Sequence, residues 1–207
     1  MTKNKAPALE TLFYGLEQIG ASQDDALILF VNAQAHGALG SHVHCAQWFY
    51  PYAKALSAQG FEVVERIEDA VGDYQAIYLL VPKNMTEARY LVARSFELLK
   101  DEGALYCACE NKAGGTRLQK MLQQFGVEIV QQISKHKCRF VQVVNTDVDD
   151  AVVRNAIDAG AVKSVDQIHF TSQAGIYGWD KIDKGSALLL QHVPDDLKGK
   201  IADFGCG

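Results

Sequence analysis

Three unbroken apolar segments constrain the fold of this chain more than any other feature. They cover residues 26–31, 76–81 and 104–109. A strand that is apolar at every position is buried on both faces, which is typical of parallel sheets with helices on each side. Apolar residues at helical spacing lie between these segments, most clearly at residues 86–100. This alternation predicts an α/β fold with a mostly parallel, Rossmann-type sheet and helices on both faces.

Other segments extend the same scheme. Further strands are predicted at residues 61–65, 127–134 and 138–144. Further helices are predicted at residues 6–19, 45–58 and 116–125. In the helix expected at 45–58, one side would carry Trp48, Phe49, Tyr52 and Leu56. The last two strands should form an antiparallel pair at one edge of the sheet.

The rhythm of elements is interrupted at residues 147–163, which are predicted to form a polar helix or linker. A strand is then expected at 167–170, a loop at 175–185 and a helix at 186–193. We therefore predict two domains, one covering residues 1–160 and a second that begins at residue 161 and runs to 207.

The chain ends on Ile-Ala-Asp-Phe-Gly-Cys-Gly, an apolar and an acidic residue followed by two alternating glycines. This pattern is typical of the opening of a nucleotide-binding loop, in which glycines let the backbone approach a ligand. The candidate cofactor-binding residues are Asp203, Gly205 and Gly207. Such loops lead into a helix that offers free N–H groups. We therefore expect these residues to be the front part of a longer protein; the alternative is a flexible Gly-Cys-Gly tail.

Composition limits the classes of partner. The net charge is −5, so any RNA contact would need a local basic patch. No apolar segment is long enough to span a bilayer, so no membrane partner is expected. The N-terminus lacks the pattern of a signal peptide, and the five cysteines are irregularly spaced. These features predict a cytoplasmic protein with reduced thiols.

Three motifs carry a resemblance to a known family. Residues 77–84 read Ile-Tyr-Leu-Leu-Val-Pro-Lys-Asn, and residues 110–115 read Glu-Asn-Lys-Ala-Gly-Gly after another strand. The third motif runs from Phe170 through Asp183 to residues 203–207. Together they resemble the RsmC family of small-subunit ribosomal RNA guanine-N2 methyltransferases. One departure is residues 176–179, which look longer than the corresponding loop of the family.

The resemblance implies two tandem methyltransferase-like domains, of which only the second binds S-adenosylmethionine. Residues 1–160 would then be a domain without a cofactor site, and 161–207 the truncated start of the catalytic domain. The acidic residue that holds the ribose and the Asn-Pro-Pro-aromatic motif would follow Gly207, so this chain has no catalytic residue. It is expected to be inactive alone, to support its own C-terminal catalytic domain and to help hold small-subunit ribosomal RNA.

Two other classes of function stay open at this point. The chain could be a non-catalytic interaction module, or a fragment of a dinucleotide-dependent oxidoreductase, since Gly-x-Gly loops occur there too. Binding of S-adenosylmethionine by the full-length protein would separate the first alternative from methyl transfer. The residues that follow Gly207 would separate the second.

The first candidate sites lie in the loop after the first strand. Residues 31–37 read Val-Asn-Ala-Gln-Ala-His-Gly and lack an acidic residue followed by Gly-x-Gly. This favours a methyltransferase-like shell that has lost its cofactor. His36, His42, His44 and Cys45 are close in sequence, but no second Cys/His cluster completes a zinc pattern. Polar loop histidines without a metal are therefore expected.

Two lysines are the candidates for RNA contact. Lys83 and Lys112 each follow a buried strand, and such strand ends share one edge of a parallel sheet, where ligands usually bind. The alternative is structural, with Asn84 and Asn111 capping helices or turns.

The remaining features have structural interpretations. The basic residues around 135–139 indicate a solvated hairpin turn rather than an RNA site. Cys107 and Cys109 should face the same side of their strand as small core residues. The apolar residues of 165–207 would lack partners, so this tail should pack poorly, and a homodimer through it is one expected outlet.

Overall fold

The structure is a computed structural model of the chain. It describes residues 6–22, 26–165, 170–194, 196, 198–200 and 202. The chain divides into two compact units, Met1–Ala161 and Val162–Gly207. We call them the front unit and the tail unit. Compactness alone does not assign domain identity, so the domain boundary after residue 160 stays a prediction.

The described residues of the front unit form a seven-stranded sheet in the order β3-β2-β1-β4-β5-β7-β6. The strands are β1 (Ile28–Val31), β2 (His44–Ala46), β3 (Val63–Val64), β4 (Tyr74–Leu80), β5 (Leu99–Glu110), β6 (Ile129–Lys135) and β7 (Cys138–Val144). The first five pair in parallel, whereas β7 pairs antiparallel with both β5 and β6. The predicted fold class, with its antiparallel edge, is confirmed.

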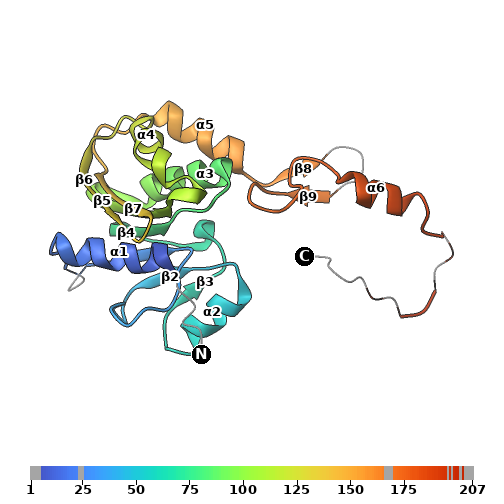
Figure 1. Cartoon of the computed structure of the whole chain (residues 1–207), viewed down its shortest axis with the longest axis horizontal. Coiled ribbons are helices and arrows are strands. Elements are labelled where there is room, and N and C mark those ends of the chain that lie inside the picture. Colours follow the sequence, from blue (N-terminus) through green and yellow to red (C-terminus); the bar gives the residue numbers. More distant parts are fainter. Residues whose placement is uncertain are drawn as a thin grey trace. The chain divides into compact units, whose positions relative to one another are not determined.

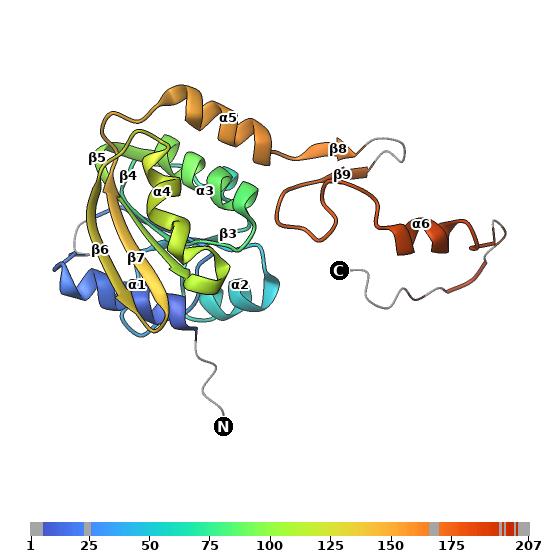
Figure 2. The same cartoon turned by 45° about the horizontal axis from the view of Figure 1, so that its top comes forward.

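Helices cover both faces of this sheet, as Figures 1 and 2 show. They are α1 (Pro7–Gln18), α2 (Tyr50–Ser57), α3 (Met85–Leu98), α4 (Leu118–Gln123) and α5 (Asp150–Gly160). Helices α1 and α2 lie on one face, and α3, α4 and α5 lie on the other. Short 3₁₀ turns complete the unit at η1 (Ile67–Asp69), η2 (Asn111–Ala113) and η3 (Gly115–Arg117).

Alternation along the strands produces two separate cores. Phe30 and Tyr78 point toward α1, where they join an edge-to-face aromatic cluster with Phe13. Their neighbours Leu29 and Ile77 point to the other face and pack with α3 and α4. Because both faces are buried, the strands need no polar positions, which explains the unbroken apolar segments. Cys107 and Cys109 belong to the second core, as predicted.

Helix α1 lies very close to the sheet at Gly15. A Cβ built on Gly15 would lie 2.4 Å from ring atoms of the fully buried Phe140 on β7. Only a residue without a side chain permits this approach. The glycine therefore sets how closely α1 covers the sheet.

The helix predicted over residues 45–58 is wrong at its start. Cys45 and Ala46 belong to β2, and the helix α2 begins at Tyr50. Of the side chains expected together on one side of this helix, only Leu56 is buried, while Trp48 is 60% exposed. Residues 44–46 form a strand rather than a helix because β2 pairs with both β1 and β3 and buries the Cys45 side chain.

The basic segment at 135–139 forms the hairpin turn between β6 and β7, as predicted. His136 and Lys137 have φ values of +50° and +59°. Two consecutive positive values are typical of the two-residue hairpin turn that matches strand twist. The Lys135 ammonium lies 3.0 Å from the centre of the Tyr14 ring, so this cation makes a cation–π contact within the chain.

The tail unit contains little secondary structure. Strands β8 (Lys163–Val165) and β9 (Phe170–Ser172) pair antiparallel, and α6 (Lys184–Leu190) follows. The Asp183 carboxylate caps α6 by accepting hydrogen bonds from the N–H groups of Gly185 and Ser186. Of the strand predicted at 167–170, residues 167–169 lie outside the described residues.

Candidate functional site

The carboxyl ends of the parallel strands meet along one edge of the sheet, which we call the rim. Asn32 follows β1, Gln47 follows β2, Val81 follows β4, and β5 ends at Glu110. In open parallel sheets this edge is where ligands bind, because the loops that leave it can diverge around a crevice. The rim is therefore the expected position of a binding site.

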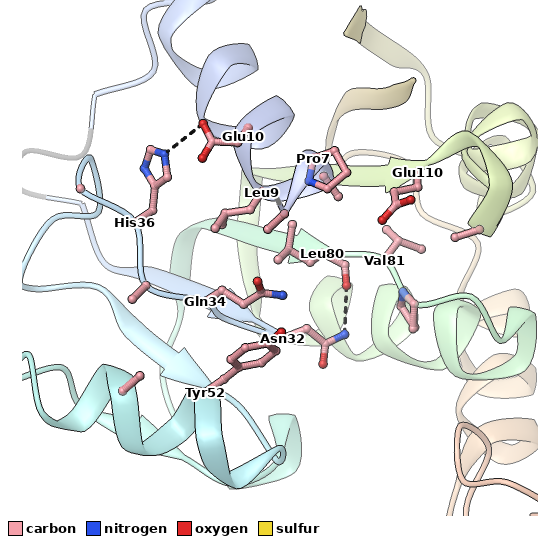
Figure 3. Close-up of a pocket in the computed structure, with 17 residues that line it drawn as sticks. Pro7, Leu9, Glu10, Asn32, Gln34, His36, Tyr52, Leu80, Val81 and Glu110 are labelled. Atoms are coloured by element: carbon pink, nitrogen blue, oxygen red, sulfur yellow. Dashed lines mark hydrogen bonds and ion pairs between the residues drawn. The ribbon is translucent and has the colours of Figure 1, made fainter. Parts of the chain in front are cut away.

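A cavity of about 890 Å³ lies at the rim, within the range of small-molecule sites. We call it the rim pocket. Its lining comes from the start of α1, the loop after β1, helix α2 and the ends of β4 and β5. Figure 3 shows Gln34 and Glu110 pointing toward the space between these elements. Sequence reasoning missed this pocket, because its residues come from segments that are far apart in the chain.

The loop after β1 does not build the usual phosphate-binding device. Asn32 adopts a left-handed φ of +56°, and its Nδ2 donates to the Leu80 carbonyl oxygen at 2.9 Å. This bond ties the ends of β1 and β4 together. Residues 32–43 contain no helix and lead directly into β2. No helix N-terminus follows β1 to offer N–H groups, so this loop does not form the phosphate-binding turn of dinucleotide-binding sheets.

His36 is held in place by its surroundings. Its ring stacks on Phe13 with centroids 3.9 Å apart, and its Nδ1 accepts a hydrogen bond from the Ala38 N–H at 3.1 Å. Its Nε2 lies 3.8 Å from a Glu10 carboxylate oxygen (Figure 3). His36 and Glu10 thus form a fixed polar wall of the rim pocket.

The other residues considered for zinc have separate roles. The Nδ1 atom of His44 lies 3.2 Å from the Tyr74 hydroxyl, and its Nε2 lies 3.7 Å from a Glu62 oxygen. Burial raises the pKa of the Cys45 thiol to about 12, so it stays protonated. No group of three His, Cys, Asp or Glu side chains is arranged for a metal ion among the described residues.

The two predicted RNA-contacting lysines lie at the rim, after adjacent strands. Lys83 is exposed beyond the end of β4. Lys112 follows β5, and its Nζ lies 3.0 Å from a Glu110 carboxylate oxygen. Glu110 therefore offsets part of the charge of Lys112. The predicted cofactor-binding residues Asp203, Gly205 and Gly207 lie outside the described residues.

The two asparagines beside these lysines differ. Asn84 caps α3, since its side-chain oxygen accepts from the Thr86 and Glu87 N–H groups, which confirms the capping prediction. The side-chain cap expected for Asn111 is wrong, because its buried Oδ1 has no hydrogen-bond partner among the described residues. Asn111 orders its loop through the backbone instead, with its N–H donating to the Lys137 carbonyl.

The Gly-Gly pair at the end of the second motif has a steric explanation. Gly114 has a φ of +118°, which side-chain-bearing residues rarely adopt. A Cβ on Gly115 would lie 2.7 Å from the Cys109 carbonyl oxygen. Both glycines let the chain turn tightly from the end of β5 into α4. This turn places Glu110 and Lys112 at the rim.

Exposed aromatic side chains lie at the start of α2 and just before it, and one of them, Tyr52, lines the rim pocket. Trp48, Phe49, Tyr50 and Tyr52 are 60%, 45%, 70% and 40% exposed, and we call them the aromatic shelf. The side chain of Gln47 links the shelf to the loop after β1. Its Nε2 donates to the Ala33 carbonyl at 2.7 Å, and its Oε1 accepts from the Phe49 N–H at 2.9 Å. The shelf is therefore fixed to the same loop that lines the pocket.

Strand order and layers define a Rossmann-like protein of the methyltransferase type. The family profile described as "Methyltransferase small domain N-terminal" matches residues 11–155, and that described as "Methyltransferase small domain" matches residues 167–207. The chain belongs to the methyltransferase small domain N-terminal family. The predicted resemblance to RsmC proteins is confirmed by the relatives below.

Relatives with the name "Ribosomal RNA small subunit methyltransferase C" match this chain. The one from Pseudomonas paraeruginosa is 30% identical over 66% of this chain and 41% of its own length. The one from Aeromonas hydrophila is 29% identical over 65% of this chain and 40% of its own length. The chain thus spans about 40% of the length of these curated relatives.

A solved structure shares the fold. It is titled as the Thermus thermophilus 16S rRNA N2 G1207 methyltransferase (RsmC) in complex with AdoMet and guanosine. The TM-score is 0.63 at 15% identity, and the match covers 91% of this chain and 52% of that one. At this identity the likeness establishes the fold alone.

Proposed function

We propose that this chain is the front part of an S-adenosylmethionine-dependent methyltransferase that modifies a guanine N2 amine of small-subunit ribosomal RNA. The observation that carries the proposal is the tandem order of two methyltransferase profiles, an N-terminal one over residues 11–155 followed by a second over residues 167–207. Relatives named for small-subunit ribosomal RNA methylation support the substrate class.

In this proposal the front unit supports the catalytic domain and helps hold RNA. When bound, S-adenosylmethionine supplies a methyl group on a sulfonium. That methyl group would pass to the guanine amine, with a thioether and a proton as the other products. Asp203, Gly205 and Gly207 would begin the cofactor loop. The rim residues described above contribute no step to this chemistry.

The reaction is tested with the complete protein and this chain side by side. The complete protein should transfer labelled methyl groups from S-adenosylmethionine to small-subunit ribosomal RNA, with N2-methylguanine as the product in nucleoside mass spectrometry. Absence of that product, or methylation of another base, would refute the proposed substrate.

The division of labour is tested by calorimetry. We propose that this chain alone neither binds S-adenosylmethionine measurably nor methylates RNA, because the loop after β1 lacks an acidic residue followed by Gly-x-Gly. Micromolar affinity of this chain for the cofactor would contradict the proposal.

The expectation that the protein works in the cytoplasm stays a prediction. No described helix is both long and apolar enough to cross a bilayer.

A further inference from the structure

We propose that the rim pocket of the front unit binds an unpaired guanine base of RNA, as a second nucleotide site apart from the catalytic domain. The proposal rests on the proposed function in one respect, since it takes RNA as the source of the base. The pocket itself is defined by the described residues of the front unit.

The pocket is large enough for a single nucleoside, and its position leaves it accessible to RNA. Its volume of about 890 Å³ lies near the top of the usual range for small ligands, and it opens at the edge of the sheet. Larger nucleotide cofactors need phosphate-binding N–H groups, which the loop between β1 and β2 does not provide. The occupant should therefore be recognised through a base rather than through phosphates.

The polar groups at the pocket favour guanine. Glu110 reaches the pocket from the end of β5 with a half-buried carboxylate. The Watson–Crick edge of guanine presents two adjacent donors, the ring N1–H and the exocyclic amine, which match the two oxygens of a carboxylate. Gln34 projects into the same space, and its amide has no hydrogen-bond partner among the described residues. It can donate to the guanine carbonyl oxygen.

The aromatic shelf supplies a stacking surface at the mouth. Tyr52 belongs both to the shelf and to the pocket lining. Exposed aromatic faces stack on unpaired bases, with a contribution of about 1–3 kcal/mol per base. Lys83 and Lys112 lie at the same rim, where they can meet the phosphates of flanking nucleotides. Stacking surface, base edge and cations therefore occur together.

Other occupants fit less well. A protein segment could cover the shelf, but only a cationic side chain such as arginine would present two parallel donors to the Glu110 carboxylate. Glu110 already has a cation in Lys112, 3.0 Å away. A neutral base with N–H donors adds hydrogen bonds to this pair without competing for its charge.

The test is an NMR titration of this chain with nucleosides, which carry no phosphate for the lysines. Guanosine should shift backbone signals at residues 32–37 and 110–113 with a dissociation constant of about 0.1–1 mM. Inosine lacks the exocyclic amine and should bind about tenfold more weakly. Adenosine, without the two adjacent donors, should also bind about tenfold more weakly.

Variants test the named residues. Glu110→Gln should weaken guanosine binding about tenfold, whereas the matched control Glu128→Gln, at an exposed position before β6, should not change it. A short uridine oligonucleotide with one guanine should bind more tightly than guanosine, which identifies RNA rather than a free nucleoside as the ligand. The inosine comparison needs no variant, so a folding defect in Glu110→Gln does not weaken the test.

Several results would overturn the proposal. One is that millimolar guanosine causes no change in the NMR signals of the rim residues. Others are equal affinity for guanosine and inosine, and displacement of guanosine by S-adenosylmethionine. A last one is that the signals of the aromatic shelf change only when the rest of the protein is present, which would indicate a protein partner. Methyl transfer by the complete protein without guanosine binding here would remove this inference alone. Guanosine binding without methyl transfer would remove only the proposed function.

Discussion

Two glutamates of the front unit differ in protonation because their surroundings differ. Burial of Glu68 opposes its ionisation, but hydrogen bonds from Arg66 and Tyr90 outweigh this and lower its pKa to about 2. Glu87, in the first turn of α3, has no such partners among the described residues, and burial raises its pKa to about 7. Single side chains therefore give the stability of this unit a specific pH dependence.

Glu87→Gln should change that dependence. Because the folded pKa of about 7 lies above the ordinary carboxyl pKa of 4.5, the folded state holds more protons between these pH values. The contribution of Glu87 to the free energy of unfolding is thus complete below pH 4.5 and is lost as pH rises through 7. Relative to wild type, Glu87→Gln should become more stable by on the order of 1 kcal/mol between pH 5 and 8, with allowance for partial exposure.

Urea unfolding of both proteins at several pH values measures this difference. Glu128→Gln serves as control, because it makes the same chemical change at an exposed position. A difference between wild type and Glu87→Gln that stays constant from pH 5 to pH 8 would contradict the prediction.

Lys83→Glu in the complete protein should weaken RNA binding and lower the dependence on salt. Removing one phosphate contact lowers the slope of log affinity against log salt by about 0.7–0.9. The effect should be larger for Lys83 than for Lys112, because the charge of Lys112 is partly offset by Glu110. The double change with Lys112→Glu should increase the effect.

Filter binding across a salt series provides the measurement, with Lys100→Glu as the matched control. Lys100 is exposed at the opposite end of β5 from the rim. An unchanged affinity and salt slope in folded Lys83→Glu would mean that the rim lysines have only a structural role.

At the scale of elements, the contact between α1 and the sheet controls both stability and the rim pocket, because the start of α1 forms part of its lining. Gly15→Ala should destabilise the front unit by about 1–3 kcal/mol, since the new methyl group would overlap the buried Phe140 ring. This overlap outweighs the gain of about 1 kcal/mol expected from replacing glycine with alanine in a helix.

Thermal unfolding measures the effect. Gly37→Ala is the matched control, because a Cβ at Gly37 would meet no atom within 4 Å and its φ is not in the left-handed region. Equal unfolding temperatures for the two variants would show that Phe140 moves aside without cost.

Elements with strong local patterns could be predicted from the sequence, and those defined by distant partners could not. The apolar segments that became β1, β4 and β5 are buried by helices on both faces, so their composition identifies them. Strand β2 covers only His44–Ala46 and depends on its neighbours β1 and β3. The aromatic spacing after it is compatible with a helix, and nothing local reveals that the aromatic side chains stay exposed.

The candidate site follows the same division. The positions of Lys83 and Lys112 at one rim could be predicted, because parallel strands end at the same edge. The ion pair of Lys112 with Glu110 and the pocket beside it could not. These depend on how α1, the loop after β1 and α2 come together in space. Gln34 and Tyr52 carry no motif that would have marked them.

At the scale of the whole molecule, the two units differ in how well they bury apolar side chains. The front unit has a core on each face of its sheet. In the tail unit, α6 has no buried residue, and Leu188, Leu189 and Leu190 are 59%, 66% and 60% exposed. Apolar groups of this size gain about 1.5–3 kcal/mol each on burial, so they favour association.

The tail unit should therefore be the less stable part of a dilute monomer. A helix as short as α6 is marginal in water without packing, so its amide hydrogens should exchange far faster than those of α3. Hydrogen-exchange mass spectrometry at low concentration tests this. Protection of α6 equal to that of α3 would contradict it. Association at high concentration should disappear when the three leucines are changed to serine.

The loop that leads directly from β1 to β2 limits which binding sites substitutions can create at the rim. A phosphate-binding turn of the kind that opens a helix needs a helix at that point, and helices in globular proteins average about 11 residues. Leu39 and Val43 of the link are buried in the core beneath α1, so an insertion would also have to displace them. No series of single substitutions leads from this loop to such a turn. Adaptation of the front unit is therefore confined to exchanging side chains around a backbone that stays the same.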